Sequence, residues 1–394
     1  MRKVFLSTLF MLFILSSGLF IAIFSSSPVL ASEAVEDSWT TLAPMNQARG
    51  HLGVVVVDGK IYAIGGGLAF GANTENNYLT ANERYDPKSN TWVTLTSMPT
   101  PRQGFAIAAC DGKIYCIGGY TYNEGGGIIP GLSVVNEVYD IASDSWSAKA
   151  SLPVSKGGLQ AQVVDGKIFV LIEADSTLFM YDPSADLWTK KTDIPGSGNG
   201  LVSALVDDKI IVTARFYSTT EIKLSYDQKI LIYTPKTDTW SEGKTAYPDL
   251  WYNFVTGATT GIYAPKNVYV FLGGGINAGT MVYDPVGDDW SDAKAMPTKR
   301  SYSGVGVVDD IFYVIGGFAT TGNAPLAVNE QYVPLGYHGT GTAGSDFDSD
   351  SPVDNLVLVG ALVGVVAAIV VIVSLVLFFK NKGKHTSYVS EVVT

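Results

Sequence analysis

The chain has 394 residues, of which 47% are hydrophobic and 16% charged, and its formal net charge is −11. This balance excludes a disordered or collagen-like chain, because aromatic residues are plentiful and glycine follows no three-residue period. A net acidic chain repels phosphate, so we expect no nucleic-acid partner. Two cysteines and three widely separated histidines are too few for a disulfide scaffold or a Cys- or His-based metal centre, and we expect no cofactor.

The N-terminus combines a basic start with a long apolar run. Two basic residues precede an apolar segment from Val4 to Phe24, and small residues follow up to Ala31. This pattern is typical of a secretory signal that is cleaved after Ala31. The apolar run is also long enough to span a bilayer, so an uncleaved anchor is the alternative. Residues 1–31 are therefore predicted to be a signal peptide or an anchor.

A second apolar run, from Leu356 to Phe379, carries no charged residue and is long enough to cross a membrane. Lysines follow it directly, and a basic flank favours the cytoplasmic side. The sequence thus predicts a single-pass protein of the cell membrane whose middle part lies outside the cell. It would have an acidic flexible linker at 335–355, a transmembrane helix at 356–379 and a cytoplasmic tail at 380–394. Gly360, Gly364 and Ala368 recur every four residues, a spacing that favours a weak homodimer of this helix.

Between the two apolar runs the chain repeats itself. Six tryptophans recur at steps of about 42 to 54 residues: Trp39, Trp92, Trp146, Trp188, Trp240 and Trp290. Seven residues before five of them stands a tyrosine: Tyr85, Tyr139, Tyr181, Tyr233 and Tyr283. The constant gap predicts that a strand ending in Tyr is joined by a tight turn to a strand containing Trp.

Each unit also begins with a second hairpin. Asp-Gly stands between apolar runs at Asp58-Gly59, Asp111-Gly112 and Asp165-Gly166, which indicates two strands joined by a tight turn. A four-stranded sheet cannot bury both faces alone, so the units are expected to stack around an axis. The last unit ends at Tyr332 without a following Trp, whereas Trp39 has no preceding Tyr. Joining the two completes six blades over residues 32–334, with the N-terminal strand closing the ring.

These residues resemble the kelch repeat. The paired glycines of several units, the Asn-Glu-x-Tyr motifs at Asn82–Tyr85, Asn136–Tyr139 and Asn329–Tyr332, and the later Trp are marks of that family. The resemblance implies an all-β, six-bladed kelch-type propeller. Such propellers include binding modules and a few enzymes, so fold alone does not decide function. A copper oxidase resembling galactose oxidase is disfavoured because only His51 lies inside the predicted propeller, where it is interpreted as a packed or rim residue.

One position of the repeat predicts a ligand site. It lies four residues after the apolar residue that follows each Trp, where the innermost strand of a blade should begin. By resemblance to kelch propellers, those strands line the central channel. The candidates at this position are Arg49, Arg102, Lys156, Trp251 and Arg300. Such a ring of cations with one aromatic residue would suit an anionic ligand. The alternative is that the arginines merely bond neighbouring carbonyl groups.

The sequence therefore favours a non-enzymatic binding module at the cell surface. Its expected partner is an unknown extracellular protein or glycan. One alternative is an exported carbohydrate-active enzyme that resembles the sialic-acid mutarotases, although no acid/base pair can be placed. The other is a structural surface element.

Overall fold

The computed structural model describes residues 34–69, 72–125, 130–172, 176–196, 198–218, 225–243, 255–273, 279–321 and 323–339. The predicted signal or anchor, transmembrane helix, dimerisation face and tail lie outside these residues, as does the linker beyond residue 339. Within the described ranges, no helix has the length and apolar character that a membrane span requires.

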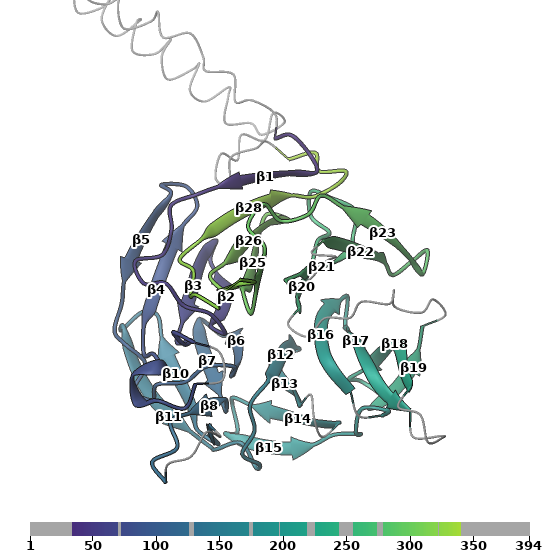
Figure 1. The fold of residues 1–394 in the computed structure, drawn as a ribbon. Helices are drawn as coiled ribbons and strands as arrows, with labels where there is room; N and C mark the ends of the chain where they lie inside the picture. The colour runs from purple at the N-terminus through teal and green to yellow at the C-terminus, as the bar shows by residue number, and fades with distance from the viewer. Residues whose placement is uncertain are drawn as a thin grey trace, which may run out of the picture. The chain divides into compact units, whose positions relative to one another are not determined.

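Six four-stranded antiparallel sheets form the blades of a ring around a central opening (Figure 1). The predicted six-bladed propeller is thereby confirmed. From the centre outwards, blade 1 contains β2 (Gly53–Val57), β3 (Lys60–Ile64), β4 (Asn82–Asp86) and β5 (Thr91–Thr94). Blade 2 contains β6 (Ala106–Cys110), β7 (Lys113–Ile117), β10 (Asn136–Asp140) and β11 (Ser145–Lys149). Blade 3 contains β12 (Leu159–Val164), β13 (Lys167–Ile172), β14 (Thr177–Asp182) and β15 (Leu187–Lys190).

The other half of the ring follows the same order. Blade 4 contains β16 (Gly198–Val206), β17 (Lys209–Ser218), β18 (Ser225–Thr234) and β19 (Thr239–Glu242). Blade 5 contains β20 (Val255–Thr259), β21 (Val268–Leu272), β22 (Thr280–Asp284) and β23 (Asp289–Ala293). Blade 6 contains β25 (Gly304–Val308), β26 (Ile311–Ile315), β28 (Asn329–Val333) and β1 (Ser38–Thr41). Short elements lie in the connections: η1 (Glu75–Asn77), β8 (Tyr120–Thr121), β9 (Gly131–Leu132), β24 (Arg300–Ser301) and β27 (Phe318–Ala319).

The first hairpin of each of blades 1 to 3 turns at the predicted Asp-Gly pair. Asp58, Asp111 and Asp165 have φ near +50°, and the glycines that follow them also have positive φ. Two consecutive left-handed residues suit a two-residue hairpin, because they match the twist of its strands. In blade 2 the turn pairs Cys110 with Lys113 and Ile107 with Cys116, so the two cysteines do not lie opposite each other. Both cysteines are free and buried.

The tyrosine and tryptophan of each repeat are direct partners on adjacent strands. Tyr85 lies opposite Trp92, and the other five blades repeat the pairing. The tyrosine hydroxyl donates to an Asp or Asn that stands two residues before the Trp, as from Tyr139 to Asp144 at 2.5 Å. The same carboxylate accepts the backbone N–H of Thr96 from blade 1, at 3.0 Å. The Trp146 indole N–H donates to the carbonyl of Thr96 at 2.9 Å. This motif thus ties neighbouring blades together.

The N-terminal strand closes the ring, as predicted. β1 pairs with β28, and Trp39 stands opposite Tyr332 in the register of the other five blades. Asp37 accepts from the Tyr332 hydroxyl and from the backbone N–H of Lys294 in blade 5, both at 2.8 Å. A strand from one end of the chain therefore supplies the contacts that a fourth strand supplies elsewhere.

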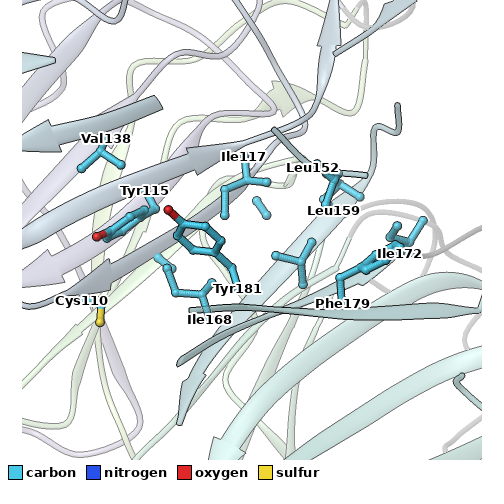
Figure 2. Packing of buried hydrophobic residues seen from close by; sticks show 13 residues of the cluster. Cys110, Tyr115, Ile117, Val138, Leu152, Leu159, Ile168, Ile172, Phe179 and Tyr181 are labelled. Carbon is cyan, nitrogen blue, oxygen red and sulfur yellow. The ribbon is translucent and has the colours of Figure 1, made fainter. Parts of the chain in front are cut away.

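The hydrophobic core lies between blades rather than within them. Figure 2 shows the cluster between blades 2 and 3, in which Tyr115 and Ile117 of β7 pack against Ile168 and Tyr181 of blade 3. Five further clusters occupy the other blade interfaces. Because every described blade buries both faces against its neighbours, the ring is the smallest unit that satisfies any one sheet.

Candidate functional site

The three arginines of the predicted ligand site stand just before innermost strands, but they are fully buried. Arg49, Arg102 and Arg300 each expose 0% of their surface. Each forms an ion pair with the glutamate of an Asn-Glu-x-Tyr motif in its own blade, namely Glu83, Glu137 and Glu330 respectively. Burial lowers the pKa of all three guanidinium groups, and the facing glutamates oppose that shift.

Blade 2 shows how the guanidinium group is hydrogen-bonded. Arg102 donates to the Glu137 carboxylate at 2.8 Å and to the carbonyl oxygens of Gly118, Val135 and Cys116 at 2.8 to 3.2 Å. The second carboxylate oxygen accepts from the Thr100 hydroxyl at 2.7 Å. These hydrogen bonds hold the paired-glycine turn and the third strand together and offset most of the cost of burying the charge, although the Arg102 Nε has no hydrogen-bond partner among the described residues.

The glutamate is present only in the blades that have the arginine. Blades 3, 4 and 5 have Phe179, Leu231 and Met281 at its position, and all three side chains are buried. Their residues at the arginine position are Lys156, Gly198 and Trp251. This all-or-none pattern is what electrostatics requires, because one buried charge without the other is costly. The glutamates belong to the Asn-Glu-x-Tyr motifs, and their co-occurrence with the arginines is the sequence signal of the buried pairs.

The prediction of an exposed cationic ring is accordingly corrected at Arg49, Arg102 and Arg300. Their side chains fold inwards onto carbonyl groups and a glutamate, which matches the alternative interpretation. Lys156 is half-buried at the equivalent place in blade 3. Trp251 lies outside the described residues. The five candidates therefore do not form one ligand-facing patch among the residues that the structure describes.

The central channel holds a cavity of about 740 Å³ instead. All six innermost strands contribute to its wall, as predicted for these strands. At one end, which we call the mouth, lie His51, Gln103, Tyr120, Tyr302 and Ser303. The His51 and Tyr302 rings are 4.6 Å apart between centroids, and those of His51 and Tyr120 are 6.0 Å apart. Among the described lining residues there is no Asp, Glu, Lys or Arg.

Long connections surround the mouth on one side of the ring. They join the second and third strands of blades 1, 2 and 6 and span residues 65–81, 118–135 and 316–328, whereas blades 3 to 5 use only 173–176, 219–224 and 273–279. Blades 6, 1 and 2 are neighbours, because β2 contacts both β25 and β6. The same three blades carry the Arg–Glu pairs.

The long connections of blades 1 and 2 are internally bonded. Asn77 is 3% exposed, and its amide accepts from the backbone N–H of Ala69 at 2.6 Å and donates to the carbonyl of Ala72 at 2.8 Å. The two connections meet where Asn123 N–H donates to the Asn73 side chain at 3.1 Å. Leu68, Leu132 and Val134 lie exposed on them. This surface has the features of a preorganised interface: apolar side chains on a fixed backbone.

The environment of His51 predicts a pH dependence. Burial lowers its pKa to about 4 from an ordinary value of 6.5. Below pH 6.5 the unfolded chain therefore binds a proton that the folded chain excludes, and stability falls as the pH drops towards 4. The loss would reach up to about 3 kcal/mol, and less where water at the mouth screens the ring.

His51→Asn tests this dependence, because Asn tolerates the left-handed backbone (φ +55°) found there. Urea unfolding at pH 7 and pH 4.5 should show a smaller stability loss for the variant than for the unaltered protein. Loss of the His51 ring contacts would lower the stability of the variant by the same amount at both pH values. An identical loss in the two proteins would contradict the assigned titration.

Comparisons with known proteins agree with this architecture. The Kelch motif model matches residues 48–99 and 101–153, which include all strands of blades 1 and 2. Alpha-scruin of Limulus polyphemus is 34% identical over 132 residues, 34% of this chain and 14% of alpha-scruin. Kelch-like protein 15 of Danio rerio is 25% identical over 277 residues, 66% of this chain and 37% of that protein. The chain thus spans well under half the length of these relatives.

A solved structure shows the same fold. YjhT superposes with a TM-score of 0.55 at 15% identity, over 73% of this chain and 95% of that chain. At this identity the likeness supports the fold alone. Kelch motifs match in the first two blades, and the Tyr–Trp register recurs in all six. The chain therefore carries Kelch motifs in its first two blades, and its six repeats form a β-propeller of the same architecture.

Proposed function

We propose that the propeller is a non-catalytic protein-interaction module that is displayed at the cell surface. The observation that carries this proposal is the asymmetry of the ring: the long, internally bonded connections belong to blades 6, 1 and 2. Leu68, Leu132 and Val134, at 38%, 47% and 36% exposure, give this side an apolar surface that a partner could cover. We call the surface formed by residues 65–69, 72–81, 118–125 and 130–135 the binding face.

The partner is an extracellular protein that contacts the binding face. The names of the relatives, scruin and Kelch-like protein, do not specify its identity. The sequence-based expectation of an anionic ligand loses its basis, because the three arginines are already paired with glutamates. The same experiment tests glycan recognition, since a glycan ligand would also have to contact the binding face.

Leu132→Asp is the variant that tests the binding face. Burial of a leucine side chain contributes about 1.5–3 kcal/mol, so its replacement by a charge should weaken binding at least tenfold. Partners would first be selected from an array of extracellular proteins and glycans with the full chain. Leu187→Asp is the matched control, because Leu187 is 63% exposed on β15, the outermost strand of blade 3. Equal affinities of the two variants would place the partner elsewhere.

The display at the cell surface rests on the two apolar segments of the sequence and has its own test. Protease added to intact cells should remove the propeller and spare a tag placed after Thr394. Cleavage of that tag from outside would overturn the proposed topology.

A further inference from the structure

The channel wall is uncharged although charged residues lie close behind it. The cavity of about 740 Å³ has the volume of a small-molecule site. Arg49 and Arg102 stand within two residues of His51 and Gly104 in the wall, but their charges point into the ion pairs with Glu83 and Glu137. A charged ligand would lose its water in this cavity without gaining an opposite charge, which is a large penalty. The wall therefore selects for an uncharged occupant.

Polarity changes along the channel. The mouth carries an imidazole, an amide and hydroxyl groups on His51, Gln103 and Tyr302. The far ends of the innermost strands contribute aliphatic side chains: Val56, Ala109, Val163, Leu205 and Val307. These strands are paired on their outer side only, so peptide groups also face the channel. An occupant would therefore need amide or hydroxyl groups together with an aliphatic part.

One stretch of the wall already satisfies its polar groups internally. Gln160 accepts from the backbone N–H of Ser203 at 2.7 Å and donates to the carbonyl of Leu201 at 2.6 Å. Gln162 donates to the carbonyl of Ser203 at 3.0 Å. These amides bridge β12 and β16 and cover part of the exposed strand edge of blade 4. The polar groups of an occupant would accordingly be received mainly on the side of blades 6, 1 and 2.

Two residues of the mouth have an unfavourable backbone conformation. His51 and Tyr302 have φ of +55° and +56°, a left-handed conformation that is unfavourable for side chains of this size. At the same position blades 2 and 3 have Gly104 and Gly158, which adopt it freely. Aromatic residues thus replace glycine in two adjacent blades where the repeat prefers glycine. Strained residues of this kind gather at functional sites.

The rings of His51 and Tyr120 at the mouth pack directly against the backbone of glycine residues. A Cβ added to Gly104 would lie 2.7 Å from the His51 ring, and one added to Gly157 would lie 2.5 Å from the Tyr120 ring. Neither glycine could therefore carry a side chain unless the ring moved. The rings hold fixed positions around the opening, and together with Gln103 and Ser303 they form a preorganised, neutral rim.

We propose that the central channel binds a small uncharged amide with an aliphatic side chain, whose polar groups lie at the mouth and whose aliphatic part points towards Ala109 and Leu205. This goes beyond the protein-interaction function, because the ligand would lie inside the channel, whereas Leu68, Leu132 and Val134 are exposed on the connections around its mouth. Such a ligand is either a free small molecule or a neutral segment of a peptide.

A charge series on the unaltered full chain tests the proposal. The probes are N-acetyl-leucine N′-methylamide, which is neutral, N-acetyl-leucine, which is an anion, and leucine N-methylamide, which is a cation. Ligand-observed NMR titration at pH 7 should give at least tenfold tighter binding for the neutral probe than for either ion. N-acetyl-glycine N′-methylamide should bind more weakly than the leucine compound. Equal affinities across the charge series would overturn the proposal.

A second arm locates the site and its source. Ala109 lines the cavity and is half-buried, so Ala109→Phe narrows the channel. This variant should bind the neutral probe at least tenfold more weakly than the unaltered protein does. Ala148→Phe, the same change at an exposed position of blade 2, is the control and should have no effect. Unchanged binding in a folded Ala109→Phe protein would exclude the channel. If a capped Ala-Val-Leu-Ala peptide binds more tightly than the leucine probe, the natural ligand is a peptide segment. If the peptide binds more weakly, the natural ligand is a free small molecule.

Discussion

Removing one partner of the Arg102–Glu137 pair should destabilise the propeller by about 3–5 kcal/mol, because the other partner is left as an uncompensated buried charge. The Arg102 side chain is 0% exposed and that of Glu137 is 7% exposed, so water cannot replace the lost partner. Arg102→Met also leaves the carbonyls of Gly118, Val135 and Cys116 without their donor. Both single variants should therefore unfold at much lower urea concentration.

The double variant Arg102→Met/Glu137→Met carries the distinctive result. It should be less destabilised than the sum of the single changes by about 2 kcal/mol or more, since neither charge remains buried. Blades 3 to 5 show that an apolar residue is accommodated at the glutamate position. Lys113→Met is the matched control, because the side chains of the Lys113–Asp140 pair in the same blade are 40% and 33% exposed, so that its loss should change stability far less than loss of the buried pair. Strict additivity of the two core changes would disprove the coupling.

The ion pairs account for the difference between the predicted and the observed direction of the arginine side chains. Their spacing places them correctly at the start of the innermost strands, yet spacing along a rim does not specify whether a long side chain folds inwards or outwards. Glu83, Glu137 and Glu330 provide the missing signal. They occur in the three blades that have the arginine and in none of the others, and two opposite charges that are gained and lost together predict a buried pair.

The sequence predicts the fold down to the register of individual strands, whereas it predicts the site only in part. The constant gap of seven residues correctly places Tyr85 opposite Trp92, because a tight turn fixes the register of a hairpin. An Asp or Asn stands two residues before each Trp, and this is equally visible in the sequence. Its spacing alone does not indicate that it accepts hydrogen bonds from the tyrosine of its own blade and, as Asp144 does, from the backbone of the neighbouring blade.

The mouth of the channel could not be built from the sequence. His51, Tyr120 and Tyr302 are far apart along the chain and come from different kinds of segment, and only the closed ring brings them together. A weaker signal existed, since aromatic residues stand at positions where blades 2 and 3 have glycine. That pattern indicates strain, but the uncharged character of the wall depends on where Arg49 and Arg102 direct their charges.

Deletion of residues 32–46 should open the ring and cost several kcal/mol. The fourth strand of blade 6 would be lost, and with it Trp39, whose indole N–H donates to the carbonyl of Lys294 at 2.8 Å. Trp39 is half-buried, so its removal alone should cost less than the roughly 3–5 kcal/mol that truncation of a fully buried tryptophan costs. Met45, which is 3% exposed in the cluster between blades 6 and 1, would be lost as well. Thermal unfolding should therefore begin at a clearly lower temperature.

The truncated protein should also expose the edge of β28 and form concentration-dependent oligomers, since an unpaired strand edge can pair with another chain. A synthetic peptide of residues 32–46 added in excess should restore both the monomer and much of the melting temperature. Trp92→Ala is the control: it removes an equivalent Tyr–Trp contact in blade 1 while leaving β1 in place, so it should lower stability without oligomers and without a response to the peptide. A truncated monomer that melts at the temperature of the full chain would show that β1 does not close the ring.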